Sequence, residues 1–200
     1  EESDFDVLKR GNACGEPHLA QSIPEREAKG LLTIFTGKGK GKSSAAFTMG
    51  QRALSAGLRV GVVQFCGGSA ESSAYQSLTR HPACDFKIFG SDCTWKPENR
   101  VSDIATVNFA WVEAKDMLCD PTYHMVLLDD INLLIKHNFL DLDQVKLALR
   151  LRPKHMHVVM TGRHAPFELI DVADIVTEMR QLKHPHSAKA PLLPQAGIEY

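Results

Sequence analysis

Short apolar runs without polar alternation recur along the chain and are separated by amphipathic segments. A strand that is buried on both faces of a sheet has this continuous apolar pattern. The runs predict five strands, at residues 31–36, 58–65, 124–130, 155–163 and 174–180. A further short strand is expected near 86–89, within a stretch from 66 to 100 that otherwise resembles a long loop.

Apolar residues spaced three and four apart predict helices between these strands. The helical segments are 43–57, 101–118, 141–153 and a short one at 166–172. Apolar strands that alternate with helices are typical of a mostly parallel sheet flanked by helices on both faces. The hydrophobic pattern therefore predicts an α/β fold.

The composition limits the number of domains and the kinds of partner. The chain has 200 residues, of which 44% are hydrophobic, and we expect one globular domain at 30–200. Residues 1–29 are polar and interrupted by glycine and proline, so we expect them to form a flexible arm. The net charge of -1 provides no global positive field, which argues against binding to nucleic acid or to a membrane surface.

The cysteines and the apolar runs bear on the cellular compartment. Five cysteines are scattered without a Cys-x-x-Cys pair or a zinc-finger spacing, which predicts reduced thiols. No apolar run reaches the roughly 18 to 20 residues of a membrane helix, and the first residues lack a secretory signal pattern. We therefore expect a cytoplasmic protein.

Glycine alternates with lysine between the first predicted strand and the first predicted helix, in the sequence TGKGKGKSS at 36–44. Backbone N–H groups in such a loop can turn toward a phosphate without interference from Cβ atoms, and the start of a helix adds about half a positive charge. The predicted phosphate-binding residues are Gly37, Lys38, Gly39, Lys40, Gly41, Lys42, Ser43 and Ser44.

The loop departs narrowly from the general P-loop consensus, since Gly37 is one residue too close to the Gly-Lys-Ser sequence and Thr36 occupies the consensus position. We expect Lys42 to reach the phosphate oxygens and Ser43 to hold Mg²⁺, while the other two lysines add positive charge. A flexible basic surface loop is the alternative.

Asp129 and Asp130 follow an apolar run, so they should emerge at the carboxyl end of a strand, where open α/β sheets bind ligands. One of them would orient Mg²⁺ beside Ser43. If the strand continues through both residues, their side chains point to opposite faces and have different roles. A solvated strand end is the alternative. Arg163 follows the next strand and would bring a guanidinium to the bound phosphates, or else is a surface arginine in a turn.

Several motifs in this order resemble the ATP:corrinoid adenosyltransferases that have a P-loop fold. The resemblance runs from about residue 30 to residue 200. The motifs are FTGKGKGKSSAAF at 35–47, VGVVQF at 60–65, TW and ENR within 94–100, VLLDD at 126–130, LRPKHMHVVMTGR at 151–163, LKHPH at 182–186 and AGIEY at 196–200. The shortened glycine spacing is itself characteristic of that family. The resemblance implies a P-loop NTPase-like (RecA-like) fold for the domain at 30–200.

The activity implied by the resemblance is transfer of the 5′-deoxyadenosyl group of ATP to the cobalt of a reduced corrinoid, with triphosphate as the leaving group. Lys40, Lys42 and Asp130 would then be catalytic, and Mg²⁺ would be held by Ser43, Asp129 and Asp130. No residue need act as a general base, because the Co(I) nucleophile carries no proton. A reductase would supply electrons, and similar proteins are homodimers.

Further binding residues follow from the resemblance. Arg52, Arg163 and His184 would contact the nucleotide. The family displaces the lower axial ligand of the corrinoid with loop aromatics, of which Trp95 matches one, while Cys93 stands where the other is usual.

Three more positions depart from the family pattern. Lys38 replaces a common Asn, Asp130 a usual Glu and Gly67 a commonly basic residue. Two other functions therefore remain open: a P-loop kinase or ATPase that breaks the γ-phosphate bond, and a non-catalytic module that binds nucleotide or corrinoid.

Overall fold

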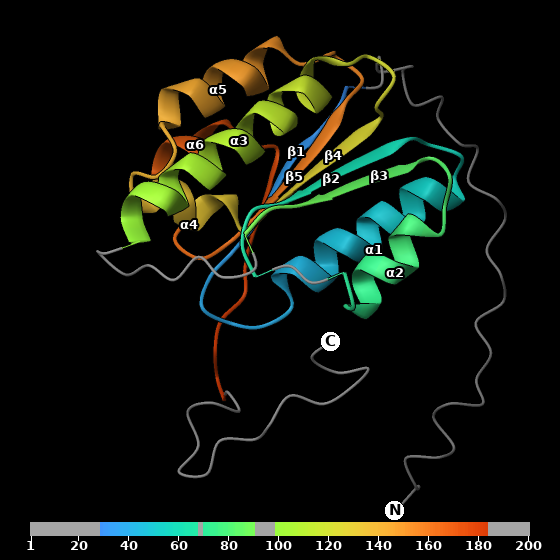
Figure 1. Ribbon diagram of the computed structural model, residues 1–200. Helices are drawn as coiled ribbons and strands as arrows, with labels where there is room; N and C mark the ends of the chain where they lie inside the picture. Colours follow the sequence, from blue (N-terminus) through green and yellow to red (C-terminus); the bar gives the residue numbers. More distant parts are fainter. Residues whose placement is uncertain (1–28, 68–69, 91–98, 184–200) are drawn as a thin grey trace, which may run out of the picture.

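The computed structural model describes residues 29–67, 70–90 and 99–183 (Figure 1). Six strands form one sheet in the order β3-β2-β4-β5-β1-β6, and all five neighbouring pairs are parallel. The strands are β1 (Leu32–Thr36), β2 (Val60–Gln64), β3 (Cys84–Ile88), β4 (Met125–Asp129), β5 (His157–Thr161) and β6 (Ile175–Glu178). The predicted parallel α/β fold is confirmed.

Helices cover both faces of the sheet (Figure 1). On one face lie α1 (Lys42–Ser55) and α2 (Ser73–Thr79). The other face carries α3 (Arg100–Cys119), α4 (Ile131–Lys136), α5 (Leu142–Leu151) and α6 (Phe167–Val172). Because helices shield both sides, every residue of β4 is buried, which explains why its sequence is an apolar run rather than an alternating one.

Each face of the sheet has its own apolar core. On the side of α1, Leu127 is fully buried, and a Cβ on Gly50 would lie 2.9 Å from its Cδ1 atom. The glycine therefore allows α1 to pack closely on β4. Burial of a leucine side chain contributes about 2 to 3 kcal/mol, and this packing fixes the axis of the helix that begins at the glycine-lysine loop.

The strand order determines which chain segments meet at the carboxyl edge of the sheet. β1 and β4 are both neighbours of β5, so three consecutive strand ends point in one direction. The glycine-lysine loop follows β1, the aspartate pair follows β4 and the turn with Arg163 follows β5. This arrangement, in which one strand separates the loop strand from the carboxylate strand, is the RecA-like one expected from the sequence.

Two short helices differ from the sequence prediction. α2 lies within the stretch expected to be mostly loop, and only Leu78 of this helix is buried, so it has no apolar periodicity to recognise. The side chain of Ser72 caps its start by accepting a hydrogen bond from the Tyr75 N–H group at 3.2 Å. α4 begins directly after Asp130 and has six residues, too few for a clear period. β3 lies two residues earlier than expected at its start.

The prediction that all five cysteines are reduced is wrong. Of the described cysteines, Cys84 and Cys119 carry free thiols, whereas Cys66, two residues after β2, is disulfide-bonded. Linear spacing misses such a bond, because pairing depends on the distance between two cysteines in the fold. Among the described residues, no helix is both long enough and apolar enough to cross a membrane.

Candidate active site

The glycine-lysine loop turns between β1 and α1 through two glycines with positive φ, Gly37 at 97° and Gly41 at 104°. Residues with a side chain rarely adopt this conformation. The outer side of the loop lies against the end of β6, where the Gly39 N–H group donates to the Met179 carbonyl oxygen at 2.7 Å. The Met179 N–H group in turn donates to the Thr36 carbonyl oxygen at 2.8 Å. The loop is therefore held on both sides of its first turn.

Lys42 lies at the first residue of α1 and is surrounded by the charges of the site. Its ammonium group donates to the Gly39 carbonyl oxygen at 2.6 Å, so the side chain folds back over the loop. Burial is the main cause that lowers the pKa of Lys42; the positive charge of Arg163 lowers it further, while Asp130 and Asp129 oppose the change. One ammonium group thus interacts with both aspartates and with the arginine.

Asp129 ends β4 and is 1% exposed. One carboxylate oxygen, Oδ1, accepts a hydrogen bond from the Thr161 hydroxyl at 2.6 Å, and the other, Oδ2, accepts one from the Gln64 amide at 2.9 Å. The Ser43 hydroxyl also donates to this carboxylate. Burial raises the pKa of Asp129, and the three hydrogen bonds act against that rise. The expected proximity of this aspartate to Ser43 is thus present.

Asp130 has a different environment from its neighbour. The strand ends at Asp129, and Asp130 is the N-cap of α4 in the left-handed conformation, with φ at 62°. Its N–H group donates to the Thr161 hydroxyl at 2.9 Å. Burial and the adjacent Asp129 carboxylate raise the pKa of Asp130 to about 7, although the positive charges of Lys42 and Arg163 oppose the change. The two carboxylates are thus inequivalent because of this break in the strand, rather than because of strand alternation.

Arg163 is exposed and follows Gly162, whose φ is 129°. Asn132 of α4 supports this turn, because its side-chain amide N–H group donates a hydrogen bond to the Gly162 carbonyl oxygen at 3.1 Å. A Cβ on Gly162 would lie 3.0 Å from the Asn132 Cβ, so the two residues pack closely. Because Arg163 interacts electrostatically with Lys42 and Asp130, the turn brings its guanidinium to the loop, as expected from the strand ends.

The oxygen ligands of this site suit a magnesium ion. Ser43 and Asp129 supply a hydroxyl and a carboxylate in mutual contact, and Asp130 adds a second carboxylate beside them. Mg²⁺ prefers such ligands and usually takes one or two protein carboxylates, with substrate phosphates and water completing the shell. Within the described ranges no three His, Cys, Asp or Glu side chains form a metal cage.

Other predicted residues lie elsewhere. Arg52 is on the last turn of α1, ten residues beyond Lys42 and therefore about 15 Å along the helix axis. Ser44 is exposed on the first turn of the same helix. Cys93, Trp95 and His184 lie outside the described residues, as do residues 1–28 of the expected arm. The roles of these residues stay predictions.

Sequence reasoning missed four residues of the site. Gln64 and Thr161 end β2 and β5, the two strands on either side of β4, and both hold Asp129. Asn132 supports the Arg163 turn, and Met179 supports the loop. For Gln64 and Thr161 the local signal was a polar residue at the end of an apolar run, which also occurs wherever a strand reaches solvent.

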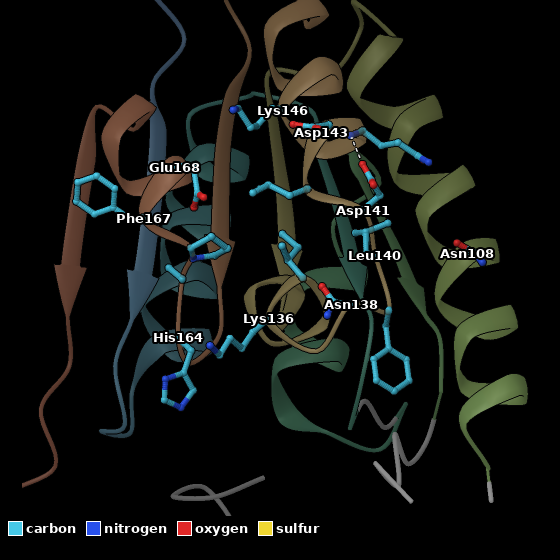
Figure 2. A pocket seen from close by; sticks show the side chains of 16 residues that line it. Asn108, Lys136, Asn138, Leu140, Asp141, Asp143, Lys146, His164, Phe167 and Glu168 are labelled. Carbon is cyan, nitrogen blue, oxygen red and sulfur yellow. Dashed lines mark hydrogen bonds between the residues drawn. The ribbon is translucent and has the colours of Figure 1, made fainter. Parts of the chain in front are cut away.

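Two cavities border this edge of the sheet. The smaller, about 500 Å³, is lined by Thr36, Gly37 and Lys38 of the loop and by Arg180 after β6. The larger, about 1060 Å³, lies between α3, α4, α5 and the segment that leads into α6 (Figure 2). Figure 2 shows His164 and Lys136 at one end of this groove and Lys146 at the other. His164 and Ala165 line both cavities, and the Ala165 N–H group donates to the Thr36 hydroxyl at 3.1 Å.

Comparison with known proteins agrees with this arrangement. The family described as ATP:corrinoid adenosyltransferase BtuR/CobO/CobP matches residues 28–200. A corrinoid adenosyltransferase from Pseudomonas aeruginosa is 40% identical over 194 residues, which cover 96% of this chain and 93% of the relative. Corrinoid adenosyltransferase CobA from Salmonella typhimurium is 38% identical over 181 residues, which cover 90% of this chain and 91% of the relative.

Similarity to solved structures is weaker. The flagellar accessory protein FlaH from Methanocaldococcus jannaschii is 15% identical, with a TM-score of 0.48 over 76% of this chain and 71% of that chain, a level that says nothing about function. The family match and the two relatives each cover most of the chain. The chain therefore belongs to the ATP:corrinoid adenosyltransferase family.

Proposed function

We propose that this protein transfers the 5′-deoxyadenosyl group of ATP to the cobalt of a reduced corrinoid and releases inorganic triphosphate. The main support for the proposal is the proximity of Lys42 and Ser43, at the start of α1, to the Asp129–Asp130 pair at the end of β4, in a chain of this family. In the reaction, the Co(I) electron pair forms a bond to C5′ of the ribose, the C5′–O bond breaks, and its electrons leave with the triphosphate.

The loop suits this leaving group because triphosphate gathers negative charge as the bond breaks. Burial and then the positive charge of the nearby Arg163 lower the pKa of Lys42, so an anion between the two side chains would relieve their repulsion. Lys38 and Lys40 are exposed on the same loop. A fixed donor aimed at developing charge contributes about 3 to 4 kcal/mol to transition-state stabilisation.

Magnesium ion would be held by Ser43 and Asp129, with Asp130 nearby. Bound there, it would neutralise charge on the phosphate oxygens. The chain's part is to present oxygen ligands in a fixed arrangement: both oxygens of Asp129 are already held by hydrogen bonds, so little reorganisation is needed when the metal binds. The aspartates need not remove a proton, since the cobalt nucleophile has none.

The remaining elements of the proposal concern the second substrate and the partners. We place the corrinoid over residues 89–100, with Trp95 and Cys93 at its lower face, and ATP in the loop and the cavity of about 500 Å³ beside Lys38. This volume is within the range of small-molecule sites. A reductase would supply electrons, and the protein would act as a homodimer. Arg52, Arg163 and His184 would contact the nucleotide.

Phosphorus NMR tests the reaction directly. The protein is incubated with ATP, Mg²⁺ and a chemically reduced corrinoid, and the phosphate products are identified. We expect triphosphate. Release of ADP would indicate a kinase or ATPase, and unchanged ATP would indicate a binding module, so either result overturns the proposal. Lys42→Ala should release little triphosphate in this assay, and Lys154→Ala is its matched control, because Lys154 is exposed and follows α5 at the opposite edge of the sheet.

A further inference from the structure

Thr161 lies between the two aspartates and contacts both of them through one hydroxyl group. The hydroxyl donates to Asp129 Oδ1 at 2.6 Å and accepts from the Asp130 N–H group at 2.9 Å. Thr161 is 1% exposed, so water does not compete for these hydrogen bonds. Because the hydroxyl group both donates and accepts a hydrogen bond, the orientation of its O–H bond is fixed.

The position of Thr161 in the sheet explains why this residue can connect the aspartates. It is the last residue of β5, the strand between the loop strand β1 and the carboxylate strand β4. The same residue precedes the Gly162–Arg163 turn, whose carbonyl is held by Asn132 of α4. A shift of Thr161 would therefore move the aspartates and the arginine turn relative to one another.

Each hydrogen bond has a distinct effect on the site. The bond to Oδ1 acts with the Gln64 bond to Oδ2 to prevent rotation of the Asp129 carboxylate. The bond from the Asp130 N–H group satisfies a donor at the start of α4 and supports a backbone with φ at 62°, which is unfavourable for an aspartate. The hydroxyl thus sets the orientation of one carboxylate and the backbone of the next.

We propose that Thr161 is a positioning residue that orders both carboxylates for the metal–nucleotide complex. It does not touch the metal; it acts through Asp129 and Asp130. This inference rests on the proposed binding of metal-ATP at the loop, but it does not depend on what is then done with the ATP. Loss of hydrogen bonds that orient metal-binding carboxylates typically weakens metal binding by about 10- to 100-fold.

The test compares the wild-type threonine with valine and serine at position 161 in the full-length protein. Thr161→Val keeps the shape and removes the hydroxyl, whereas Thr161→Ser keeps the hydroxyl. Thr33→Val is a control at another threonine buried in the sheet, in β1. Mn²⁺ replaces Mg²⁺, and its binding to protein with ATP is measured by electron paramagnetic resonance without any corrinoid. We expect Mn²⁺ affinity to fall at least about tenfold in Thr161→Val and to stay within about threefold in the other two variants.

Steady-state kinetics give a second readout that a purely structural role would not change. In Thr161→Val we expect the Mg²⁺ concentration for half-maximal rate to rise about tenfold, while the KM for the corrinoid is unchanged. If valine prevents folding, as judged by circular dichroism, Thr161→Ala replaces it in the same comparison with serine.

A folded Thr161→Val protein with wild-type Mn²⁺ affinity would overturn the inference, and so would a serine variant as weak as the valine variant. The proposed adenosyl transfer fails in a different way, since wild-type protein would then yield ADP or unchanged ATP in the NMR experiment while the Mn²⁺ difference between valine and serine remained.

Discussion

Replacing Gly37 by alanine should distort the glycine-lysine loop through two separable effects. Gly37 has φ at 97°, which disfavours any residue with a Cβ. The new Cβ would also lie 2.4 Å from the Met179 carbonyl oxygen and 2.8 Å from the Met179 nitrogen, both of them backbone atoms. Neither atom can move aside without displacing the end of β6.

Gly57 allows the first effect to be measured alone. Its φ is 79°, but a Cβ there would meet nothing within 4 Å. We expect Gly57→Ala to lower the free energy of unfolding by about 1 to 2 kcal/mol, the cost of the left-handed backbone. Gly37→Ala has the same conformational cost and also strains the hydrogen bond from the Gly39 N–H group to the Met179 carbonyl oxygen. That hydrogen bond contributes about 1 kcal/mol. With the steric contact to Met179 included, we expect Gly37→Ala to lower the free energy of unfolding by about 3 kcal/mol or more.

The effect on nucleotide binding should separate the variants further. If the loop shifts to relieve the contact, its N–H groups no longer converge on the phosphates, and ATP affinity should fall at least about tenfold, or 1.4 kcal/mol. Gly57→Ala lies at the far end of α1 and should bind ATP normally. Urea unfolding and isothermal titration with ATP and Mg²⁺ measure the two quantities.

The reasoning would be refuted by a Gly37→Ala protein that loses no more stability than Gly57→Ala and binds ATP as the wild type does. That result would mean that the loop can shift without affecting phosphate binding.

Three further changes test the charged groups of the site. Lys42→Ala should lower triphosphate release by about 100-fold or more, since it removes one donor to developing charge; a near-normal rate in a protein with unchanged circular dichroism would contradict this. Arg163→Ala should weaken ATP binding about tenfold, with part of the loss restored by Arg163→Lys; titration calorimetry measures both, and equal affinity in all three proteins would rule out the contact. Burial and the neighbouring Asp129 carboxylate raise the pKa of Asp130 from its ordinary value of 3.8 to about 7 in the folded protein, so the metal-free folded protein binds an extra proton and its stability falls as pH rises from about 4 to 7. Asp130→Asn should flatten this part of the profile in urea unfolding with EDTA, and an unchanged slope would show that another group is responsible.

The hydrophobic pattern was sufficient to predict most strands of the sheet. β2 and β4 are buried along nearly their whole length, so their sequences are apolar without alternation. β6 was also predicted from its sequence, although all four of its residues are exposed at the edge of the sheet. α2 was missed because one buried leucine makes no periodic pattern.

The principal site residues could be predicted from the positions of strand ends. Lys42, Asp129 and Arg163 each follow or end a parallel strand, and the carboxyl ends of such strands meet at one edge. Thr161 could not be recognised in this way, because its role depends on β5 lying between β1 and β4. That order results from long-range pairing, which local sequence does not contain. The left-handed backbone of Asp130 likewise depends on the tertiary contact to Thr161.

The place of β1 within the sheet has a consequence for synthesis on the ribosome. β1 is the first described strand, yet its two neighbours are β5 and β6, the last two to be translated. About 140 residues separate the end of β1 from the start of β6, a delay on the order of 10 s at ordinary translation rates. Until β5 is translated, the apolar segment Leu32–Thr36 has no partner on either side, and its second partner follows only with β6. The nascent chain must therefore carry an unpaired, aggregation-prone strand through most of its elongation, and chaperones that shield such segments should raise the yield of active protein.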